Sequence, residues 1–357
     1  MDTHMTRAFD LAARADHLVK TNPKVGAIIL KDGKIISEGY HQVYGQAHAE
    51  IHALKNANES VEGATMVVTL EPCSHHGKTP PCALAIQEAG IQNVIIGTLD
   101  PNPTVAGQGV KMLKDAGIHV EVLNTQDAQN DLNPAYLKKM KTGTPFIRLK
   151  SAISLDGKMA LKNGQSQWIT GEAARAQVQA YRKHAGAILT GIGTVLADDP
   201  RLTVHDDLKA SPDRIILDTH LKIPMTSQIV QSAKDVPTHV LTTEDDEEKI
   251  NGLKSLGVRV SIVSKKKAHL DLDAVWAYLT SLPVHEVLVE SGPRLTTALL
   301  KAGWVDVWDV MMAPKVLGGD AQNMVGPLNL TELTHALHYR VKDVSQLGDD
   351  LWIRFIR

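Results

Sequence analysis

The stretch TMVVTLEPCSHHGKTPPC, residues 65–82, carries both cysteines of the chain, Cys73 and Cys82. Its first six residues form an apolar run that is typical of a buried strand. Two prolines precede Cys82, and proline is favoured in the first turn of a helix, so we expect a helix over residues 82–90. The stretch therefore predicts a strand–loop–helix unit of an α/β domain, with one thiol at each end of the loop.

A third candidate ligand, His48, opens another predicted helix over residues 47–57. Helix N-termini favour thiolates and carboxylates through the helix dipole. One imidazole and two thiolates leave the fourth position of zinc open, as in catalytic zinc sites. Bound zinc can lower the pKa of water to about 7, and Glu50 could then move the water's protons. We predict a catalytic zinc held by His48, Cys73 and Cys82, with Glu50 as the acid–base residue.

Less specific interpretations of these residues exist. An HxE pair can lie on a solvated helix face by chance, and free cysteines are often inert and buried. A non-enzymatic zinc module would need a fourth protein ligand, for which the sequence offers only His75 or His76 nearby. A His/Cys/Cys set with a non-ligand glutamate is the zinc deaminase arrangement, although its usual Cys-x2-Cys spacing is Cys-x8-Cys here. The conjunction favours a deaminase.

Length and composition limit the remaining possibilities. A chain of 357 residues is long enough for two domains. It has 38 basic and 40 acidic residues with no basic block, and 4% aromatics, so we expect no nucleic-acid partner. No run of 18 apolar residues exists, and residues 1–20 form a charged amphipathic pattern, so we expect no membrane segment and no signal peptide. With both cysteines assigned to metal, the expected location is cytoplasmic.

Predicted strands and helices alternate along the first part of the chain, which indicates a βαβ-rich unit with parallel strands. Polar residues 124–133 and 138–144 are predicted to form a helix and a linker. We place a domain boundary near residue 145, giving domains 1–144 and 145–357. The predicted elements are helices 6–19, 47–57, 82–90 and 110–116, and strands 25–30, 34–38, 65–70, 94–97 and 119–123.

Four motifs in the first third of the chain resemble the deaminase signature of the bifunctional riboflavin-biosynthesis deaminase–reductase family. The resemblance implies a cytidine-deaminase-like α/β/α domain. It also implies hydrolytic deamination of 2,5-diamino-6-ribosylamino-4(3H)-pyrimidinone 5′-phosphate, a small pyrimidine ribonucleotide. The motifs are Asn22-Pro23-Lys24-Val25-Gly26, Gly45-x-x-His48-Ala49-Glu50, the run from Glu71-Pro72-Cys73 to Cys82, and Asp100-Pro101-Asn102-Pro103 with Gly107-x-Gly109.

The insert between the cysteines suits a phosphorylated substrate. His75 and Lys78 could hold a ribose phosphate by charge-assisted hydrogen bonds, and a solvated basic loop is the alternative. Asn22 can donate and accept in one plane, which suits a pyrimidine or ribose edge, although asparagine before proline is also a common turn residue. Asn22, His75 and Lys78 are therefore the predicted substrate contacts of the deaminase.

The second half contains residues 146–158, Gly164-x-Ser166-Gln167-Trp168, 188–200 and Glu290-Ser291-Gly292-Pro293. This set resembles the reductase of the same family, and the resemblance implies a dihydrofolate-reductase-like α/β fold, the use of NADPH and reduction of the ribosyl side chain to a ribityl chain. The resemblance also implies a homo-oligomer formed through this domain. The cofactor contacts that it implies are Ala152, Trp168, Thr194, Asp198, Gly292, Pro293 and Arg294. The substrate contacts are Lys150, Ser166, Arg182, Leu202, His205 and Glu290.

Three features of this half can be assessed from the residues. Gly292 joins an apolar strand, 287–289, to a helix, 294–302, whose N-terminus could bind a pyrophosphate, although a plain strand-to-helix turn fits as well. Lys150, a charge in an apolar strand, is expected to pair with Glu290 or else to extend to solvent. His205 stands where the family has arginine, which would make phosphate binding weaker and pH-dependent. A deaminase whose second half is only a scaffold is the rival interpretation.

Overall fold

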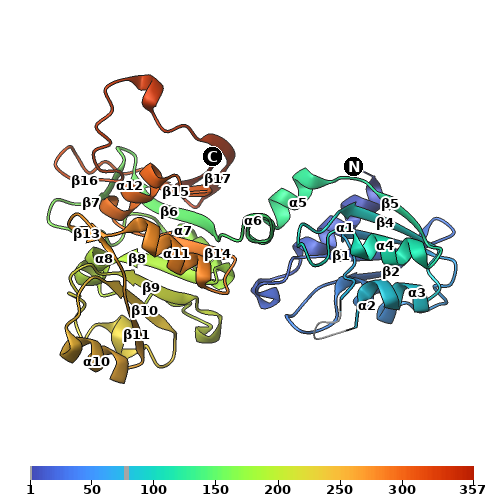
Figure 1. The fold of residues 1–357 in the computed structure, drawn as a ribbon. Helices are drawn as coiled ribbons and strands as arrows, with labels where there is room; N and C mark the ends of the chain where they lie inside the picture. The colour runs from blue at the N-terminus through green and yellow to red at the C-terminus, as the bar shows by residue number, and fades with distance from the viewer. Residues whose placement is uncertain (1, 76–79) are drawn as a thin grey trace. The chain divides into compact units, whose positions relative to one another are not determined.

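The computed structural model describes residues 2–75 and 80–357, and the chain divides into two compact units, residues 1–144 and 145–357 (Figure 1). Each unit contains its own sheet and core and is described by itself. No helix in the described ranges is both long enough and apolar enough to cross a membrane. The prediction of two α/β domains is confirmed.

The sheet of the first unit has the strand order β2-β1-β3-β4-β5. Strands β3, β4 and β5 are parallel, as predicted, but β1 pairs antiparallel with both β2 and β3. The parallel character expected of this unit therefore holds for β3, β4 and β5, whereas β1 forms an antiparallel hairpin with β2 across a short turn and an antiparallel pair with β3. The bounds are β1 Gly26–Lys31, β2 Lys34–Tyr40, β3 Thr65–Leu70, β4 Asn93–Thr98 and β5 His119–Val122.

Helices cover both faces of this sheet. Apolar side chains of α2, α3 and α4 pack on one face with Ile29, Met66 and Val68, and α1 packs on the other with Ile28 and Val67. The predicted helix 6–19 was wrong at both ends, because α1 stops at Ala13 and a separate 3-10 turn covers His17–Val19. The bounds are α1 Thr3–Ala13, α2 Ala49–Asn56, α3 Cys82–Glu88, α4 Gln108–Asp115, α5 Gln126–Leu132 and α6 Pro134–Thr142.

The sheet of the second unit has nine strands in the order β11-β10-β9-β8-β14-β6-β15-β18-β17. All neighbours from β11 to β15 are parallel, whereas β18 and β17 add an antiparallel hairpin at one end. The bounds are β6 Phe146–Ser154, β8 Ala187–Gly191, β9 Asp213–Leu217, β10 Thr238–Thr242, β11 Val258–Ile262, β14 Glu286–Glu290, β15 Val307–Ala313, β17 Arg340–Leu347 and β18 Asp350–Ile356. Short ladders join β7 Lys158–Ala160 to β16 Gln322–Asn323, and β12 Lys265–Lys266 to β13 His269–Leu270.

Two cores lie on the opposite faces of this sheet. One contains side chains of α7, α8, α9 and α10, and the other contains side chains of α11 and α12. Because parallel strands are buried on both faces, they consist of near-continuous apolar runs. The bounds are α7 Glu172–His184, α8 Ile192–Asp198, α9 Gln228–Gln231, α10 Glu247–Ser255, α11 Leu272–Ser281 and α12 Pro293–Ala302, with 3-10 turns at Leu208–Ala210 and Leu333–His335.

A network of charges crosses the middle of this sheet. Arg148 on β6 donates to Glu286 on β14 at 2.5 Å and to Asp309 on β15 at 2.6 Å. Asp309 is fully buried and also accepts from Trp352 and Arg354 on β18, at 3.0 and 2.8 Å. The ion pairs are thus linked across four neighbouring strands.

Candidate metal centre and a second candidate site

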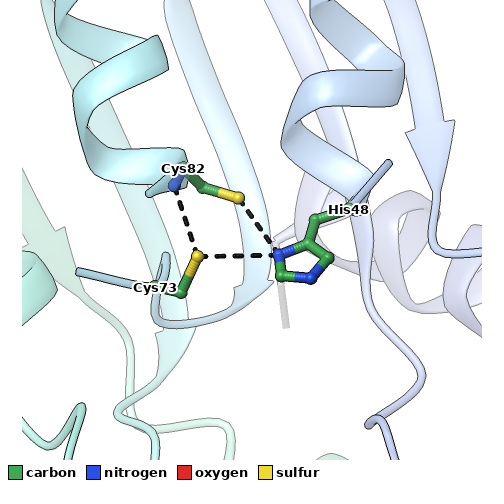
Figure 2. Close-up of side chains that lie close together, drawn as sticks. All are labelled: His48, Cys73 and Cys82. Atoms are coloured by element: carbon green, nitrogen blue, oxygen red, sulfur yellow. Dashed lines mark hydrogen bonds between the residues drawn. The ribbon is translucent and has the colours of Figure 1, made fainter. Parts of the chain in front are cut away.

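Three element ends bring His48, Cys73 and Cys82 together (Figure 2). His48 is the N-cap of α2, Cys73 follows β3 after Glu71 and Pro72, and Cys82 is the first residue of α3 after Pro81. One candidate ligand atom from each side chain lies within 4.8 Å of the others. The strand–loop–helix pattern predicted Cys73 just after the strand and Cys82 at the start of the helix, and the structure has both there.

The separations fit a zinc ion. Nδ1 of His48 lies 3.6 Å from the sulfur of Cys73 and 3.3 Å from that of Cys82 (Figure 2). Zinc–nitrogen bonds of about 2.0–2.1 Å and zinc–sulfur bonds of about 2.3 Å at tetrahedral angles imply a nitrogen–sulfur distance of about 3.5 Å. The donor set and its spacing therefore suit zinc, and within the described residues no fourth His, Cys, Asp or Glu joins the group.

Electrostatics at the cluster favour binding of a cation. The Cys82 side chain donates to Cys73, and this bond, with help from His48, lowers the pKa of the Cys73 thiol to about 4. The same bond and burial raise the pKa of Cys82. The hydrogen bond to Cys73 raises the pKa of His48. These contacts favour the thiolate form of Cys73, which is the form in which cysteine binds zinc.

Glu50 lies beside the cluster in the first turn of α2 and is 4% exposed. Burial, followed by the negative charge of Cys73, raises the pKa of Glu50 to about 7. Its carboxyl group also interacts directly with the thiol of Cys82. A surface position for Glu50, which the structural-zinc alternative required, is excluded. A buried carboxyl group that titrates near neutral pH suits general acid–base work.

His41 was missed by the sequence interpretation, yet it connects Asn22 to the cluster. Its buried ring lies edge-on to His48, with the ring centroids 5.4 Å apart. Nδ1 of His41 lies 3.0 Å from the Ala47 carbonyl oxygen, so it must donate, and Nε2 then accepts from the Asn22 amide at 3.0 Å. This orients the oxygen of Asn22 away from the ring. A single histidine after a strand carries no motif by which it could have been found.

Glu71 was quoted as part of a motif but given no role. Its buried carboxylate accepts backbone N–H bonds from Asp100, Gly107 and Val110, at 3.2, 3.0 and 3.1 Å. It therefore anchors the loop that carries the fourth motif next to Cys73. His75 is exposed in the insert. Lys78, the other predicted phosphate contact, lies outside the described residues.

In the second unit, Lys150, Arg182 and Glu290 form one cluster. Arg182 binds Glu290 through two hydrogen bonds of 2.8 and 3.1 Å, and the Lys150 ammonium lies 3.7 Å from the same carboxylate. The predicted pairing of Lys150 with Glu290 is confirmed, and Lys150 does not extend to solvent, since its side chain is 15% exposed. Burial opposes the charge on Glu290, but the two cations outweigh it and lower its pKa to about 2.

The carboxyl ends of β8 and β14, which pair in parallel, lead into Gly193 and into the predicted cofactor contact Gly292. A Cβ placed on Gly193 or Gly292 would meet no atom within 4 Å. Gly292 is the N-cap of α12, so the unpaired backbone N–H groups of the first helical turn follow it. Nucleotides bind at the carboxyl edge of parallel sheets. The unobstructed glycines and the helix end are therefore compatible with a dinucleotide such as NADPH.

The other predicted cofactor contacts lie on β6, in α8, in the first turn of α12 and in the loop that contains Trp168. Trp168 is 65% exposed and stacks under the guanidinium of Arg175, 4.7 Å from the ring centroid. Asp198, at the end of α8, accepts from the Ser166 hydroxyl at 3.2 Å, which joins a predicted cofactor residue to a predicted substrate residue. Ala152 lies on β6, Thr194 in α8, and Pro293 and Arg294 in the first turn of α12.

The structure limits how two predicted substrate contacts, Leu202 and His205, could meet a ligand. Leu202 is 3% exposed and packs in the core, so only its backbone could meet a ligand. The backbone N–H of His205 donates to Gln179 on α7 at 3.1 Å, and its exposed ring lies 3.4 Å from the amide nitrogen of the same residue. An arginine at 205 would share this exposed position.

Comparisons with known proteins agree with both halves. The family model for the cytidine and deoxycytidylate deaminase zinc-binding region matches residues 1–98, and that for the RibD C-terminal domain matches residues 145–353. The riboflavin biosynthesis protein RibD of Escherichia coli K12 is 41% identical over 99% of this chain and 98% of its own length. That of Aquifex aeolicus is 40% identical over the same shares.

Solved structures of similar proteins cover the whole chain. Acinetobacter baumannii RibD superposes with a TM-score of 0.88 at 40% identity, covering 99% of this chain and 97% of its own. A diaminohydroxyphosphoribosylaminopyrimidine deaminase/5-amino-6-(5-phosphoribosylamino)uracil reductase from Thermotoga maritima has a TM-score of 0.86 at 32% identity, with the same coverage. With a zinc-type cluster in one unit and relatives that match both units, the chain belongs to the RibD family of bifunctional deaminase–reductases of riboflavin biosynthesis.

Proposed function

We propose that the two units act in sequence on one pyrimidine nucleotide. The first deaminates 2,5-diamino-6-ribosylamino-4(3H)-pyrimidinone 5′-phosphate, and the second reduces the ribosyl side chain of the product with NADPH to give 5-amino-6-(5-phosphoribitylamino)uracil. The observation that carries this proposal is the buried Glu50 beside the His48/Cys73/Cys82 cluster, in a chain that also contains the separate Lys150–Arg182–Glu290 cluster.

In the deaminase, His48, Cys73 and Cys82 would hold zinc. Bound zinc supplies a water of lowered pKa at neutral pH. Glu50 accepts a proton from that water and delivers it to a ring nitrogen as oxygen adds to the ring carbon. It would next take the remaining proton from the hydroxyl group added to that carbon and pass it to the amino group, so that ammonia leaves as the carbonyl forms and a carbon–oxygen bond replaces a carbon–nitrogen bond. Asn22, with its amide nitrogen engaged by His41, offers its oxygen to the substrate.

In the reductase, Lys150, Arg182 and Glu290 would hold the ribosyl side chain. Reduction places a hydride on C1′ of the ribose and a proton on the ring oxygen as that bond breaks, and NADPH supplies the hydride. The open space at Gly193 and Gly292 would receive the cofactor, with the N-terminus of α12 toward its pyrophosphate. Leu202 and His205 would contact the substrate phosphate, Leu202 through its backbone.

A coupled assay tests this function. The parent protein, loaded with zinc and supplied with the diaminopyrimidine nucleotide, should release one ammonia per substrate and then oxidise one NADPH. Ammonia release without NADPH oxidation would contradict the second activity and would support the scaffold alternative. If the protein neither releases ammonia nor oxidises NADPH, the assignment as a whole is contradicted.

We also propose that the reductase unit forms the homo-oligomer. Strand β17 lies at the end of the sheet, and its side chains Val341 and Val344 are 59% and 55% exposed. An edge strand with unpaired backbone groups and exposed valines is a ready surface for a second copy. Val344→Asp should lower the mass measured by sedimentation to that of a monomer. Ile262→Asp, at the exposed opposite edge of the same sheet, should leave it unchanged.

The division of the chain supports domains 1–144 and 145–357 as the two catalytic domains. The nucleotide and NADPH are metabolites of the cytoplasm, which is the location that we propose.

A further inference from the structure

The loop that carries the predicted substrate contact Leu202 has a strained backbone. Asp199 and Leu202 have φ angles of 40° and 53°. Residues with side chains seldom adopt such angles and keep them only where their surroundings enforce them. The Leu202 side chain is in the core, so only its backbone could meet the substrate. The contacts that hold the backbone in this conformation therefore also fix the position of its N–H and carbonyl groups.

Two guanidinium groups hold the carbonyls on either side of Leu202. Arg182, which also binds Glu290, donates to the Thr203 carbonyl at 3.0 Å. Arg214 donates to the Arg201 carbonyl at 3.0 Å. In a trans peptide the N–H points opposite to the carbonyl, so the Leu202 N–H is directed away from Arg214. No acceptor in residues 2–75 or 80–357 takes this N–H.

Arg214 is unusual in the core of this unit. It is fully buried on β9, and its contacts are to hydroxyl and carbonyl oxygens. Besides Arg201, the acceptors are Thr238 at 2.6 and 3.1 Å, the hydroxyl and carbonyl of Ser232 at 2.8 and 3.1 Å, and the Val236 carbonyl at 3.0 Å. Burial lowers its pKa to about 10, against the effect of Asp235. All five N–H groups are nevertheless satisfied.

A purely structural role explains only part of this arrangement. The contacts with Ser232, Val236 and Thr238 fasten the turn between α9 and β10, which an apolar side chain on β9 could support by packing. The bond to Arg201 has a different target, because it reaches the substrate loop. Gln228 on α9 holds the same loop from the solvent side, through the Asp199 carbonyl at 2.7 Å and Nε of Arg201 at 2.9 Å.

We infer that Arg214 is a positioning residue for the reduction: it holds the Arg201 carbonyl so that the backbone N–H of Leu202 stays available to the anionic end of the substrate. This inference rests on the proposed reductase function and adds to it a residue that is not among the predicted cofactor or substrate contacts. Arg214 acts through Arg201 and touches neither substrate nor cofactor.

Arg214→Lys tests the inference, because it keeps the charge and the stem but offers fewer and shorter-reaching donors. The KM for the deaminated substrate should rise about tenfold, equivalent to about 1.4 kcal/mol. The kcat and the NADPH dissociation constant should stay within about twofold of the parent, since the hydride site is separate. Deamination by the same chain serves as an internal control.

Thr238→Val is the matched structural control. It removes an Arg214 acceptor on the side away from the loop, so it should lower the unfolding temperature while leaving the substrate KM unchanged. An unchanged KM in Arg214→Lys, or an equal rise in Thr238→Val, would overturn the inference. Should Arg214→Lys fail to fold, Gln228→Ala carries the test from an exposed position: a KM at the parent value would show that anchoring this loop does not matter. A parent protein that cannot reduce the substrate refutes the proposed function instead.

Discussion

At the scale of single residues, the candidate metal site could be predicted because its chemistry needs few residue types at fixed places. Histidine, two cysteines and a glutamate were assigned from spacing and from the helix starts around them. His41 could not be found in this way, because its role comes from the packing of its ring against His48 and not from any local pattern. Arg214 was equally invisible, since an arginine in an apolar strand gives no sign of which carbonyls it will reach.

We expect Cys73→Ala to lose the zinc. Removing one of three ligands leaves an incomplete donor set, which cannot hold zinc at the parent affinity. Elemental analysis should show about one zinc per parent chain and nearly none in the variant. Ser74→Ala, at the next position, should retain the metal. Full metal content in Cys73→Ala would refute the ligand assignment.

Glu50→Gln should keep zinc and fold but lose deamination. The amide cannot take up the water proton, and general acid–base catalysis of this kind is typically worth about 10²–10⁴-fold. Ammonia release from the diaminopyrimidine nucleotide measures the effect. The exposed Glu59→Gln in the same unit is the control. Deamination by Glu50→Gln at the parent rate would mean that another group moves the proton.

His205→Arg should strengthen binding of the deaminated substrate in the reductase. A fixed guanidinium in this exposed position offers a charge-assisted bond to phosphate, so we expect KM to fall roughly three- to tenfold. Equal KM values for the two proteins would show that residue 205 does not meet the phosphate.

At the scale of elements, strongly apolar strands were predicted best. The strand at residues 65–70 has the predicted bounds, and the strand and helix around Gly292 are each within a residue or two. The pairing of strands could not be predicted, since the side-chain pattern of β1 is the same for antiparallel and parallel neighbours. The end of α1 was also missed, because its amphipathic pattern continues past Ala13 into a 3-10 turn.

Glu290, at the end of β14, should make the reductase unit sensitive to acid. Its pKa is lowered to about 2 in the folded protein, against about 4.3 in an unfolded chain. The stabilisation is therefore complete above about pH 4.3 and is lost as the pH falls toward 2. Glu290→Gln should already lack it at pH 7, with a loss of roughly 3–5 kcal/mol because Arg182 and Lys150 remain buried without their partner.

Chemical denaturation between pH 7 and pH 3, followed by tryptophan fluorescence, measures this difference, since all five tryptophans lie beyond residue 145. The gap between parent and variant should narrow on acidification. A gap that stays constant down to pH 3 would contradict the lowered pKa of Glu290.

At the scale of the whole molecule, the two activities should separate by mutation. Glu50→Gln should still oxidise NADPH when given the deaminated intermediate, and Glu290→Ala should release ammonia and stop there. The reason is that the zinc-type cluster and the Glu290 cluster draw on different units of the chain. Loss of both activities in either variant would indicate that the units depend on each other for catalysis.

The charge network around Arg148 restricts how the reductase sequence can diverge. Replacing Arg148 alone would leave the carboxylate of Glu286 without its cation and Asp309 with Arg354 as its one remaining arginine partner, and replacing Asp309 alone would leave Arg148 and Arg354 without the carboxylate between them. Because a lone buried charge is far less tolerable than a neutral substitution of the whole group, these positions can change only in concert. Among relatives, residues 148, 286 and 309 should therefore covary. An evolutionary path between two different sets of residues at these positions must pass through sequences in which the charges of the group remain balanced.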